Sequence, residues 1–317
     1  MRTNRYFRFS LLLLIALSSC GVENTHSLPF ATFEVPSDYR KERTEEKGKV
    51  ETLTYTTKDY FLQSGKTEEK RMNVYLPYSY DSSQKYEVLY LLHGTDKMEV
   101  DHINTWFETI GVRNILENLI GEKIIEPLIV VAPTFYSYGL YGKDEVHNVR
   151  ESSPVKTNSS ENFSEELRFD IVPFVESHYS TYADTTDEAG LKKSRHHRAF
   201  AGLSNGCRIA LEQVMEDSFD YFSRYGCYSS YTDPENLLSA LHQEKYQGMN
   251  LDYAFFSAGI YDFAYNGEKK MVRALRKDPL FREDNTEFVN ITLAYHSARA
   301  WRVSFYDTLL RFYGETR

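Results

Sequence analysis

The 317-residue sequence has few cysteines, no excess of positive charge and no long apolar run. Three cysteines are too few for a disulfide-stabilised scaffold. With 37 Lys and Arg against 46 Asp and Glu, the net charge is −9, which argues against a nucleic-acid partner because such proteins need a basic surface. No spacing typical of metal ligands and no phosphate-binding glycine loop occurs, so we expect neither metal nor cofactor.

The overall amino-acid composition is typical of a globular domain. The sequence is 41% hydrophobic and 26% charged, and its length suits one large domain or two modest ones. The aromatic share of 15% is high and predicts a large aromatic core or pocket.

The amino terminus has the features of an export signal. Arg2, Arg5 and Arg8 precede the apolar run Leu11–Leu17, which is far shorter than the about 20 residues needed to span a bilayer. The run is followed by Ser18-Ser19-Cys20, an ending that resembles the bacterial lipoprotein signal, in which the cysteine is lipidated. An ordinary cleaved signal is the alternative. We therefore expect an extracytoplasmic protein anchored to a membrane through Cys20.

The sequence divides into three regions: a signal peptide at 1–20, a polar tether at 21–45 and a single folded domain at 46–317. In the last region, strand-like runs alternate with helical patterns, which predicts an α/β fold with a mainly parallel sheet covered on both faces. Predicted strands include 50–57, 72–76, 87–92, 127–132, 198–203, 225–228, 253–257 and 288–295; predicted helices include 103–120, 165–179, 205–216, 234–242, 269–276 and 301–313.

The most informative motif is Gly202-Leu203-Ser204-Asn205-Gly206. It lies between a predicted strand and a predicted helix, which is the context of a nucleophile elbow. The serine of such an elbow stands on a sharp turn, and larger residues two positions away on either side would collide. The motif predicts Ser204 as a catalytic nucleophile.

A nucleophilic serine needs a base and an acid that orients the base. Two histidines follow Ser204; His242 lies on a predicted surface helix, whereas His296 directly follows a predicted strand. We predict His296 as the base. Asp262 follows a strand at its carboxyl end and is the predicted acid, whereas Asp252 precedes the same strand.

Two backbone amides should bind the oxyanion of the tetrahedral intermediate. One belongs to Asn205, the residue after the nucleophile, and we choose Thr95 in the loop after strand 87–92 as the other. Candidate substrate contacts are Trp106, Tyr136 and Tyr228. For Trp106 a place in the core beneath its helix is the preferred interpretation, and Tyr136 could instead pack within its own aromatic loop. Cys207 and Cys227 could pair, although buried free thiols are the preferred interpretation.

These motifs together resemble the esterase D-like α/β-hydrolases, specifically the feruloyl and acetylxylan esterases of bacterial plant-wall degradation. The resemblance runs from near Gly48 to the end and includes NVYLPYSYDSSQKYEVLYLLHG, IIEPLIVVAP, HRAFAGLSNG and a final histidine, His296, five residues before Trp301. It implies an α/β-hydrolase fold, Ser204, Asp262 and His296 as the triad, and Thr95 and Asn205 as oxyanion donors. The chain departs from the family pattern at Tyr295, where glycine is common.

The resemblance implies a serine esterase that acts on feruloyl or acetyl esters of xylan through an acyl-enzyme. One alternative is a hydrolase of siderophores or other small esters, since related families share the elbow and triad. A non-enzymatic alternative is a lipoprotein that only binds glycans, because fold alone does not determine function. The expected partners are thus an ester substrate linked to carbohydrate and a membrane reached through the lipid anchor at Cys20; the oligomeric state stays open.

Overall fold

The computed structural model describes residues 34–61, 63–95, 102–137, 140 and 162–314. These residues form one eight-stranded sheet in the order β1-β2-β4-β3-β5-β6-β7-β8. Strand β2 is antiparallel to both of its neighbours, and all pairs from β4 to β8 are parallel. The predicted mainly parallel α/β sheet is confirmed. Its strands are β1 (Lys49–Lys58), β2 (Thr67–Leu76), β3 (Glu87–Leu92), β4 (Leu128–Ala132), β5 (Arg198–Leu203), β6 (Arg224–Tyr228), β7 (Tyr253–Gly259) and β8 (Thr286–Ile291).

The central strands are continuous apolar runs because both of their faces are covered. In β3, Val88, Tyr90 and Leu92 belong to the core on one face of the sheet, and Leu89 and Leu91 belong to the core on the other. All five side chains are buried. The period of two residues along an extended strand divides one run of sequence between two cores.

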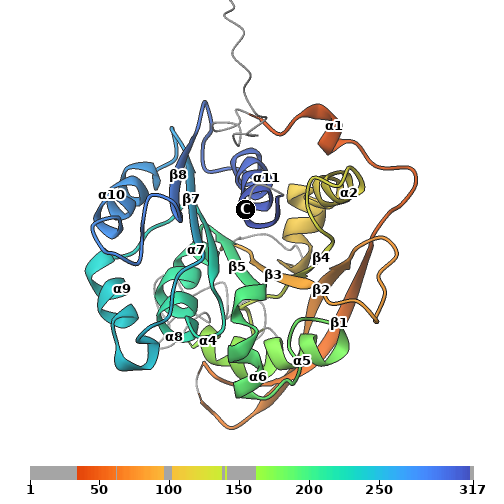
Figure 1. Cartoon of the computed structure of the whole chain (residues 1–317), viewed down its shortest axis with the longest axis horizontal. Helices are drawn as coiled ribbons and strands as arrows, with labels where there is room; N and C mark the ends of the chain where they lie inside the picture. Colours follow the sequence, from red (N-terminus) through yellow and green to blue (C-terminus); the bar gives the residue numbers. More distant parts are fainter. Residues whose placement is uncertain (1–33, 62, 96–101, 138–139, 141–161, 315–317) are drawn as a thin grey trace, which may run out of the picture.

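Helices cover both faces of the sheet, as Figure 1 shows. Helices α2 and α11 contribute to one core, and α5, α7, α9 and α10 contribute to the other. The α-helices are α1 (Ser37–Arg40), α2 (Arg113–Gly121), α4 (Phe163–Glu166), α5 (Val172–His178), α6 (Glu188–Lys193), α7 (Asn205–Ile209), α8 (Glu216–Ser218), α9 (Pro234–Leu241), α10 (Tyr265–Leu275) and α11 (Ala298–Tyr313). Wider π-turns at Leu167–Ile171 and Ala210–Met215 join α4 to α5 and α7 to α8.

Several predicted elements have other bounds in the structure; β2, for example, begins at Thr67 and not at residue 72. The helix expected over 103–120 is interrupted at Gly111, whose φ of 75° ends a helical turn in the left-handed conformation before α2 begins. The strand expected over 288–295 ends at Ile291, and a turn with Leu293 at a φ of 52° follows. His296 therefore lies in a loop beyond β8 and does not directly follow the strand.

The boundary predicted at residue 46 is also corrected. Val35 is buried, and the Tyr39 ring lies 5.6 Å from the ring of Tyr306. The Asn118 side chain donates hydrogen bonds to the carbonyls of Tyr39 and Lys41. The folded unit thus includes residues 34–45, which lie against α2 and α11. Cys20 and the rest of the predicted signal and tether lie outside the described residues.

A buried ion pair joins the helices to the amino end of the sheet. Arg198, the first residue of β5, is almost fully buried, and its Nε lies 2.5 Å from Oε1 of Glu176 on α5. Its guanidinium also donates to the carbonyls of Leu191 and Tyr221 and to the hydroxyl of Ser194. Because each of these partners accepts a hydrogen bond from the guanidinium, the buried positive charge of Arg198 is compensated by hydrogen bonds.

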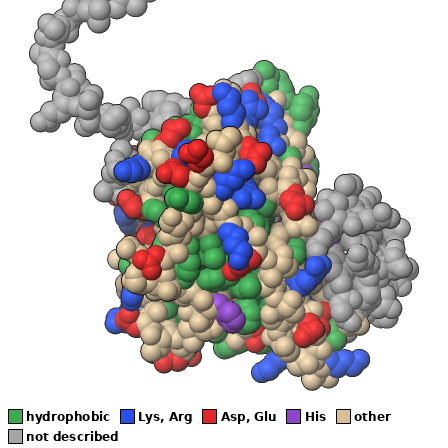
Figure 2. All heavy atoms as spheres, turned by 90° about the vertical axis from the view of Figure 1, so that its right-hand side faces the viewer, with side chains coloured by type: hydrophobic (Ala, Val, Ile, Leu, Met, Phe, Trp, Pro, Cys, Tyr) green, Lys and Arg blue, Asp and Glu red, His purple; other side chains and the backbone are tan. Residues whose placement is uncertain are grey.

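Figure 2 looks onto the side of the molecule that carries β1, where positive and negative side chains are interspersed around exposed apolar ones. Among the described residues, no helix has both the length and the apolar character needed to span a membrane. Cys207 and Cys227 are buried free thiols, in agreement with the preferred interpretation of the sequence.

Candidate active site

Ser204 stands on the sharp turn that connects β5 to α7. Its backbone has φ 52° and ψ −118°, a conformation that residues other than glycine rarely adopt. The Ser204 amide donates to the carbonyl of Tyr228 at the end of β6 with a distance of 2.8 Å. This bond to the neighbouring strand holds the strained turn and places the hydroxyl above the carboxyl ends of the parallel strands.

The two glycines of the motif are required by close backbone contacts. A Cβ on Gly202 would lie 2.3 Å from the carbonyl oxygen of Gly206. A Cβ on Gly206 would lie 2.4 Å from the carbonyl oxygen of His93, at the end of β3. The first glycine allows the turn to close, and the second allows α7 to approach the loop after β3.

Ser204, His296 and Asp262 meet through hydrogen bonds. His296 Nε2 lies 3.0 Å from Ser204 Oγ, and His296 Nδ1 lies 3.0 and 3.1 Å from the two carboxylate oxygens of Asp262. Because a carboxylate only accepts, Nδ1 carries a proton and Nε2 is free to accept the hydroxyl proton. This arrangement can activate the serine hydroxyl as a nucleophile.

Close packing brings the loops that carry Asp262 and His296 together. A Cβ on Gly259, the last residue of β7, would lie 2.3 Å from the carbonyl oxygen of Ala294. That same carbonyl accepts a hydrogen bond from the amide of Tyr261 at 3.0 Å. The early end of β8 lets the chain turn back over Gly259, and this turn delivers the imidazole to the serine.

Several donors keep Asp262 ionised. Burial alone would raise the pKa of the Asp262 carboxyl, but hydrogen bonds from His296, the Ala264 amide and the Ser229 hydroxyl hold that pKa below its ordinary value. The Ala264 amide lies 2.9 Å from Asp262 Oδ1. Asp262 therefore accepts the hydrogen bond of a local turn and also contacts the imidazole.

Trp301 on α11 contacts both Ser229 and His296. Its indole N–H donates to the Ser229 hydroxyl at 3.1 Å, and its ring meets the His296 ring edge-on, with centroids 5.0 Å apart. A continuous chain of contacts therefore runs from Trp301 through Ser229 and Asp262 to His296. Ser229 has a φ of 63°, which aims its side chain at the carboxylate from the end of β6.

The two predicted oxyanion donors belong to segments that adjoin Ser204. Asn205 is the first residue of α7, so its amide has no intrahelical carbonyl to bond. A Cβ on Gly94 would lie 3.0 Å from Ser204 Cβ, which places the loop that contains Thr95 against the nucleophile. The Gly94 carbonyl accepts a hydrogen bond from Nδ1 of the buried His93 at 2.8 Å, and this bond orients the Gly94–Thr95 peptide.

His93 is a neutral structural residue. Its Nε2 lies 2.8 Å from the Thr134 hydroxyl, and its ring stacks on Phe135 with centroids 4.4 Å apart. Burial, together with the nearby His102, holds the pKa of the His93 imidazole well below its ordinary value. In the neutral ring Nδ1 donates to the Gly94 carbonyl and Nε2 accepts from the Thr134 hydroxyl, so both ring nitrogens are satisfied.

The predicted substrate contacts disagree with the structure. Trp106 and Tyr228 are 1% and 0% exposed and pack against each other, with ring centroids 6.1 Å apart. Tyr136 is 4% exposed and stacks on His93. All three rings are core residues here, because long-range neighbours such as Phe305 on α11 fill the space around them.

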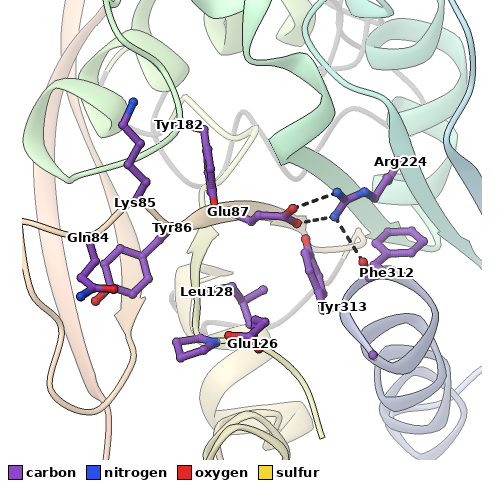
Figure 3. A pocket seen from close by; sticks show the side chains of 12 residues that line it. Gln84, Lys85, Tyr86, Glu87, Glu126, Leu128, Tyr182, Arg224, Phe312 and Tyr313 are labelled. Carbon is purple, nitrogen blue, oxygen red and sulfur yellow. Dashed lines mark hydrogen bonds and ion pairs between the residues drawn. The ribbon is translucent and has the colours of Figure 1, made fainter. Parts of the chain in front are cut away.

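A cavity of about 490 Å³ lies at the opposite end of the strands (Figure 3). Its lining includes Glu87, Leu128 and Arg224, which begin β3, β4 and β6, and the Glu87–Arg224 ion pair lies at its centre. It is therefore separate from the site around Ser204. Within the described ranges, no group of three His, Cys, Asp or Glu side chains could hold a metal ion.

With this geometry in place, residues 64–303 match the family model described as "Esterase". The chain is a member of the esterase family. This esterase is a carboxylic ester hydrolase, and its sheet order and neighbours are those of the α/β-hydrolase fold. The predicted family resemblance and fold class are confirmed.

Two relatives indicate which kind of ester hydrolase this chain is similar to. The esterase is 31% identical over 282 residues to endo-1,4-beta-xylanase Y of Acetivibrio thermocellus, with 84% of this chain but only 23% of that protein covered. It is 29% identical, with a TM-score of 0.73, to a serine-to-alanine mutant of the feruloyl esterase module from Clostridium thermocellum complexed with sinapinate; the match covers 88% of this chain and 92% of that one. The enterobactin esterase of Shigella flexneri, at 13% identity and a TM-score of 0.56, covers 83% of this chain and 59% of that one and shares the fold alone.

Proposed function

We propose that this esterase hydrolyses acyl esters of plant cell-wall polysaccharide, feruloyl or acetyl esters of xylan, with Ser204, His296 and Asp262 as its catalytic triad. The observation that carries the proposal is the position of His296, whose two ring nitrogens lie within hydrogen-bond distance of the serine hydroxyl and the buried carboxylate. The three side chains come from three separate loops, and their contacts run from carboxylate to imidazole to hydroxyl, as acyl transfer to serine requires.

The reaction follows from this arrangement. His296 Nε2 takes the proton of Ser204 as Oγ attacks the ester carbonyl, and Asp262 stabilises the imidazolium that forms. The amides of Thr95 and Asn205 bind the oxyanion. The imidazolium then gives its proton to the alcohol oxygen as the ester C–O bond breaks, which leaves an acyl-enzyme. Water, deprotonated by His296, releases the acid and restores the serine.

The relatives support the substrate class. A feruloyl esterase module with sinapinate and a xylanase both match over more than four-fifths of this chain. The feruloyl esterase module suggests a hydroxycinnamoyl acyl group and the xylanase suggests xylan, so hydroxycinnamoyl esters on xylan are the first substrates to assay.

The direct test compares the wild type with Ser204→Ala on methyl ferulate, p-nitrophenyl acetate and feruloylated arabinoxylan oligosaccharide. We expect hydrolysis by the wild type and a loss of at least about 10⁴-fold in kcat for the variant, with an unchanged circular dichroism spectrum. A fluorophosphonate probe should label the wild type alone. Undiminished turnover by Ser204→Ala would contradict the assignment, and hydrolysis of a catecholate siderophore but of none of these esters would contradict the substrate class.

We further propose that the protein is exported and tethered to a membrane through a lipid on Cys20, as the amino-terminal pattern indicates. Metabolic labelling with an alkyne fatty acid should mark the wild type in bacterial membranes. Cys20→Ala should lose both the label and the membrane association. A wild-type protein without label would refute the anchor.

A further inference from the structure

Three exposed aromatic side chains belong to the two loops that carry the catalytic imidazole and acid. Tyr261, Phe263 and Tyr295 are 52%, 79% and 64% exposed, and we call them the aromatic rim. The rings of Phe263 and His296 have centroids 4.5 Å apart, and those of Tyr261 and Tyr295 are 5.1 Å apart. Large apolar side chains exposed as a group, in contrast to single ones, mark a binding surface.

The local sequence explains why the rim lies beside the site. Tyr261 and Phe263 flank Asp262, and Tyr295 precedes His296. The hydrogen bond from the Tyr261 amide to the Ala294 carbonyl joins the two loops, so the rim residues meet although 34 positions separate Asp262 from His296. The turn that places the His296 imidazole beside Ser204 therefore also places the aromatic rim next to the active site.

The direction of proton transfer identifies the part of the substrate that the rim meets. In ester hydrolysis His296 Nε2 must give its proton to the oxygen of the departing alcohol, so this oxygen comes within hydrogen-bond distance of the imidazole. The Phe263 ring lies against that same imidazole. The Phe263 ring therefore lies where the alcohol half of the ester can contact it, and Tyr261 and Tyr295 belong to the same two joined loops.

The chemistry of the rim fits a neutral sugar. Residues 259–265 and 292–298 contain no Lys or Arg, and their one carboxylate, that of Asp262, is buried and paired with His296. Aromatic faces pack against the C–H face of a sugar ring, and the two tyrosine hydroxyls offer hydrogen bonds to sugar hydroxyls. A long alkyl alcohol would instead need an enclosed apolar pocket.

We propose that Tyr261, Phe263 and Tyr295 form a subsite for the sugar ring whose hydroxyl oxygen is the leaving group. This inference rests on the proposed esterase function and adds a determinant of substrate choice. None of the three residues was singled out from the sequence as a substrate contact.

The test measures selectivity between two esters of the same acid. For Phe263→Ala we expect kcat/KM on feruloylated arabinoxylan oligosaccharide to fall about tenfold more than kcat/KM on methyl ferulate, mainly through KM. Phe263→Tyr keeps the ring and should restore the selectivity. Phe169→Ala, at an aromatic residue that is exposed elsewhere, is the matched control and should leave the selectivity unchanged.

Three outcomes would overturn the subsite: an equal loss on both esters, no loss on either, or dimerisation that Phe263→Ala abolishes without a change in selectivity. A second measurement does not depend on turnover. Calorimetry should detect binding of unesterified arabinoxylan oligosaccharide to Ser204→Ala, and weaker binding when Phe263→Ala is added. Absence of binding overturns the subsite even if methyl ferulate is hydrolysed. If the wild type hydrolyses neither ester, the proposed function fails, while the calorimetric result still decides whether the rim binds sugar.

Discussion

The indole N–H of Trp301 donates a hydrogen bond to the hydroxyl of Ser229 at 3.1 Å, and that hydroxyl in turn hydrogen-bonds with the carboxylate of Asp262. The same indole meets the imidazole of His296 edge-on. One side chain of the last helix therefore positions both the base and the acid that orients it. Such connected polar groups contribute more together than their separate removal suggests.

We expect Trp301→Phe to lower kcat about tenfold. The variant keeps an aromatic ring beside His296 but removes the hydrogen-bond donor to Ser229, and small displacements of catalytic groups lower the rate strongly. Ser229→Ala should act in the same direction, and the double variant should lose less than the two losses combined, because both act through Asp262. Steady-state kinetics on methyl ferulate measures all three. Full activity of Trp301→Phe would show that the hydrogen bond has no positioning role.

Gly94→Ala tests the approach of the loop after β3 to the nucleophile. The new Cβ would lie 2.8 Å from Leu203 Cδ1 and 3.0 Å from Ser204 Cβ, so the loop must move away. If the Thr95 amide then no longer reaches the oxyanion, kcat should fall by about 10²-fold, as for loss of one donor. Gly121→Ala, whose Cβ would meet only the mobile end of Arg43, is the control. Equal kinetics for both variants would argue against Thr95 as a donor.

Arg198→Met tests the buried ion pair at the amino end of β5. The substitution leaves the Glu176 carboxylate buried beside an apolar side chain, and we expect a loss of about 3–5 kcal/mol in the free energy of unfolding. Adding Glu176→Leu should recover part of this loss. Arg282→Met, at an exposed pair with Asp284, should cost less than about 1 kcal/mol. Urea denaturation followed by fluorescence measures each value, and similar costs for the two single variants would contradict the prediction.

Glu216→Gln tests a pH dependence of stability. Burial, with the nearby carboxylates of Asp217 and Glu212, raises the pKa of Glu216 to about 7. Between its ordinary pKa and about pH 7 the folded state binds more protons than the unfolded state, so stability falls as the pH rises through this window. Because Glu216 is partly exposed, the effect should be about 1 kcal/mol after solvent screening.

The amide variant cannot ionise and should therefore gain stability relative to the wild type as the pH rises from 4 to 8. Thermal unfolding at several pH values measures the difference. Glu69→Gln, at an exposed position on β2, is the control and should show no such trend. A constant difference between wild type and Glu216→Gln across this range would refute the prediction.

Much of the fold was predictable because its signals are local. The strands 87–92 and 198–203 were predicted with their observed bounds, since continuous apolar runs of six residues have few alternatives in a parallel sheet. The end of β8 was predicted four residues too late. The sequence from Thr292 to Tyr295 still alternates like a strand, and only its packing over Gly259 turns the chain.

The amino-acid sequence by itself determined the strand–turn–helix unit around Ser204, because the clash that requires Gly202 is with Gly206 and arises within that unit. The need for glycine at position 206 comes from the carbonyls of Leu92 and His93 and is a tertiary one. The sequence also shows that the predicted acid and the predicted histidine base follow the serine along the chain. Only the tertiary structure decided which aromatic rings face solvent. Trp106 is covered by Phe305 from nearly 200 residues away, whereas Phe263 is largely exposed among the described residues. No local pattern distinguishes two such rings, because burial depends on what distant segments pack against them.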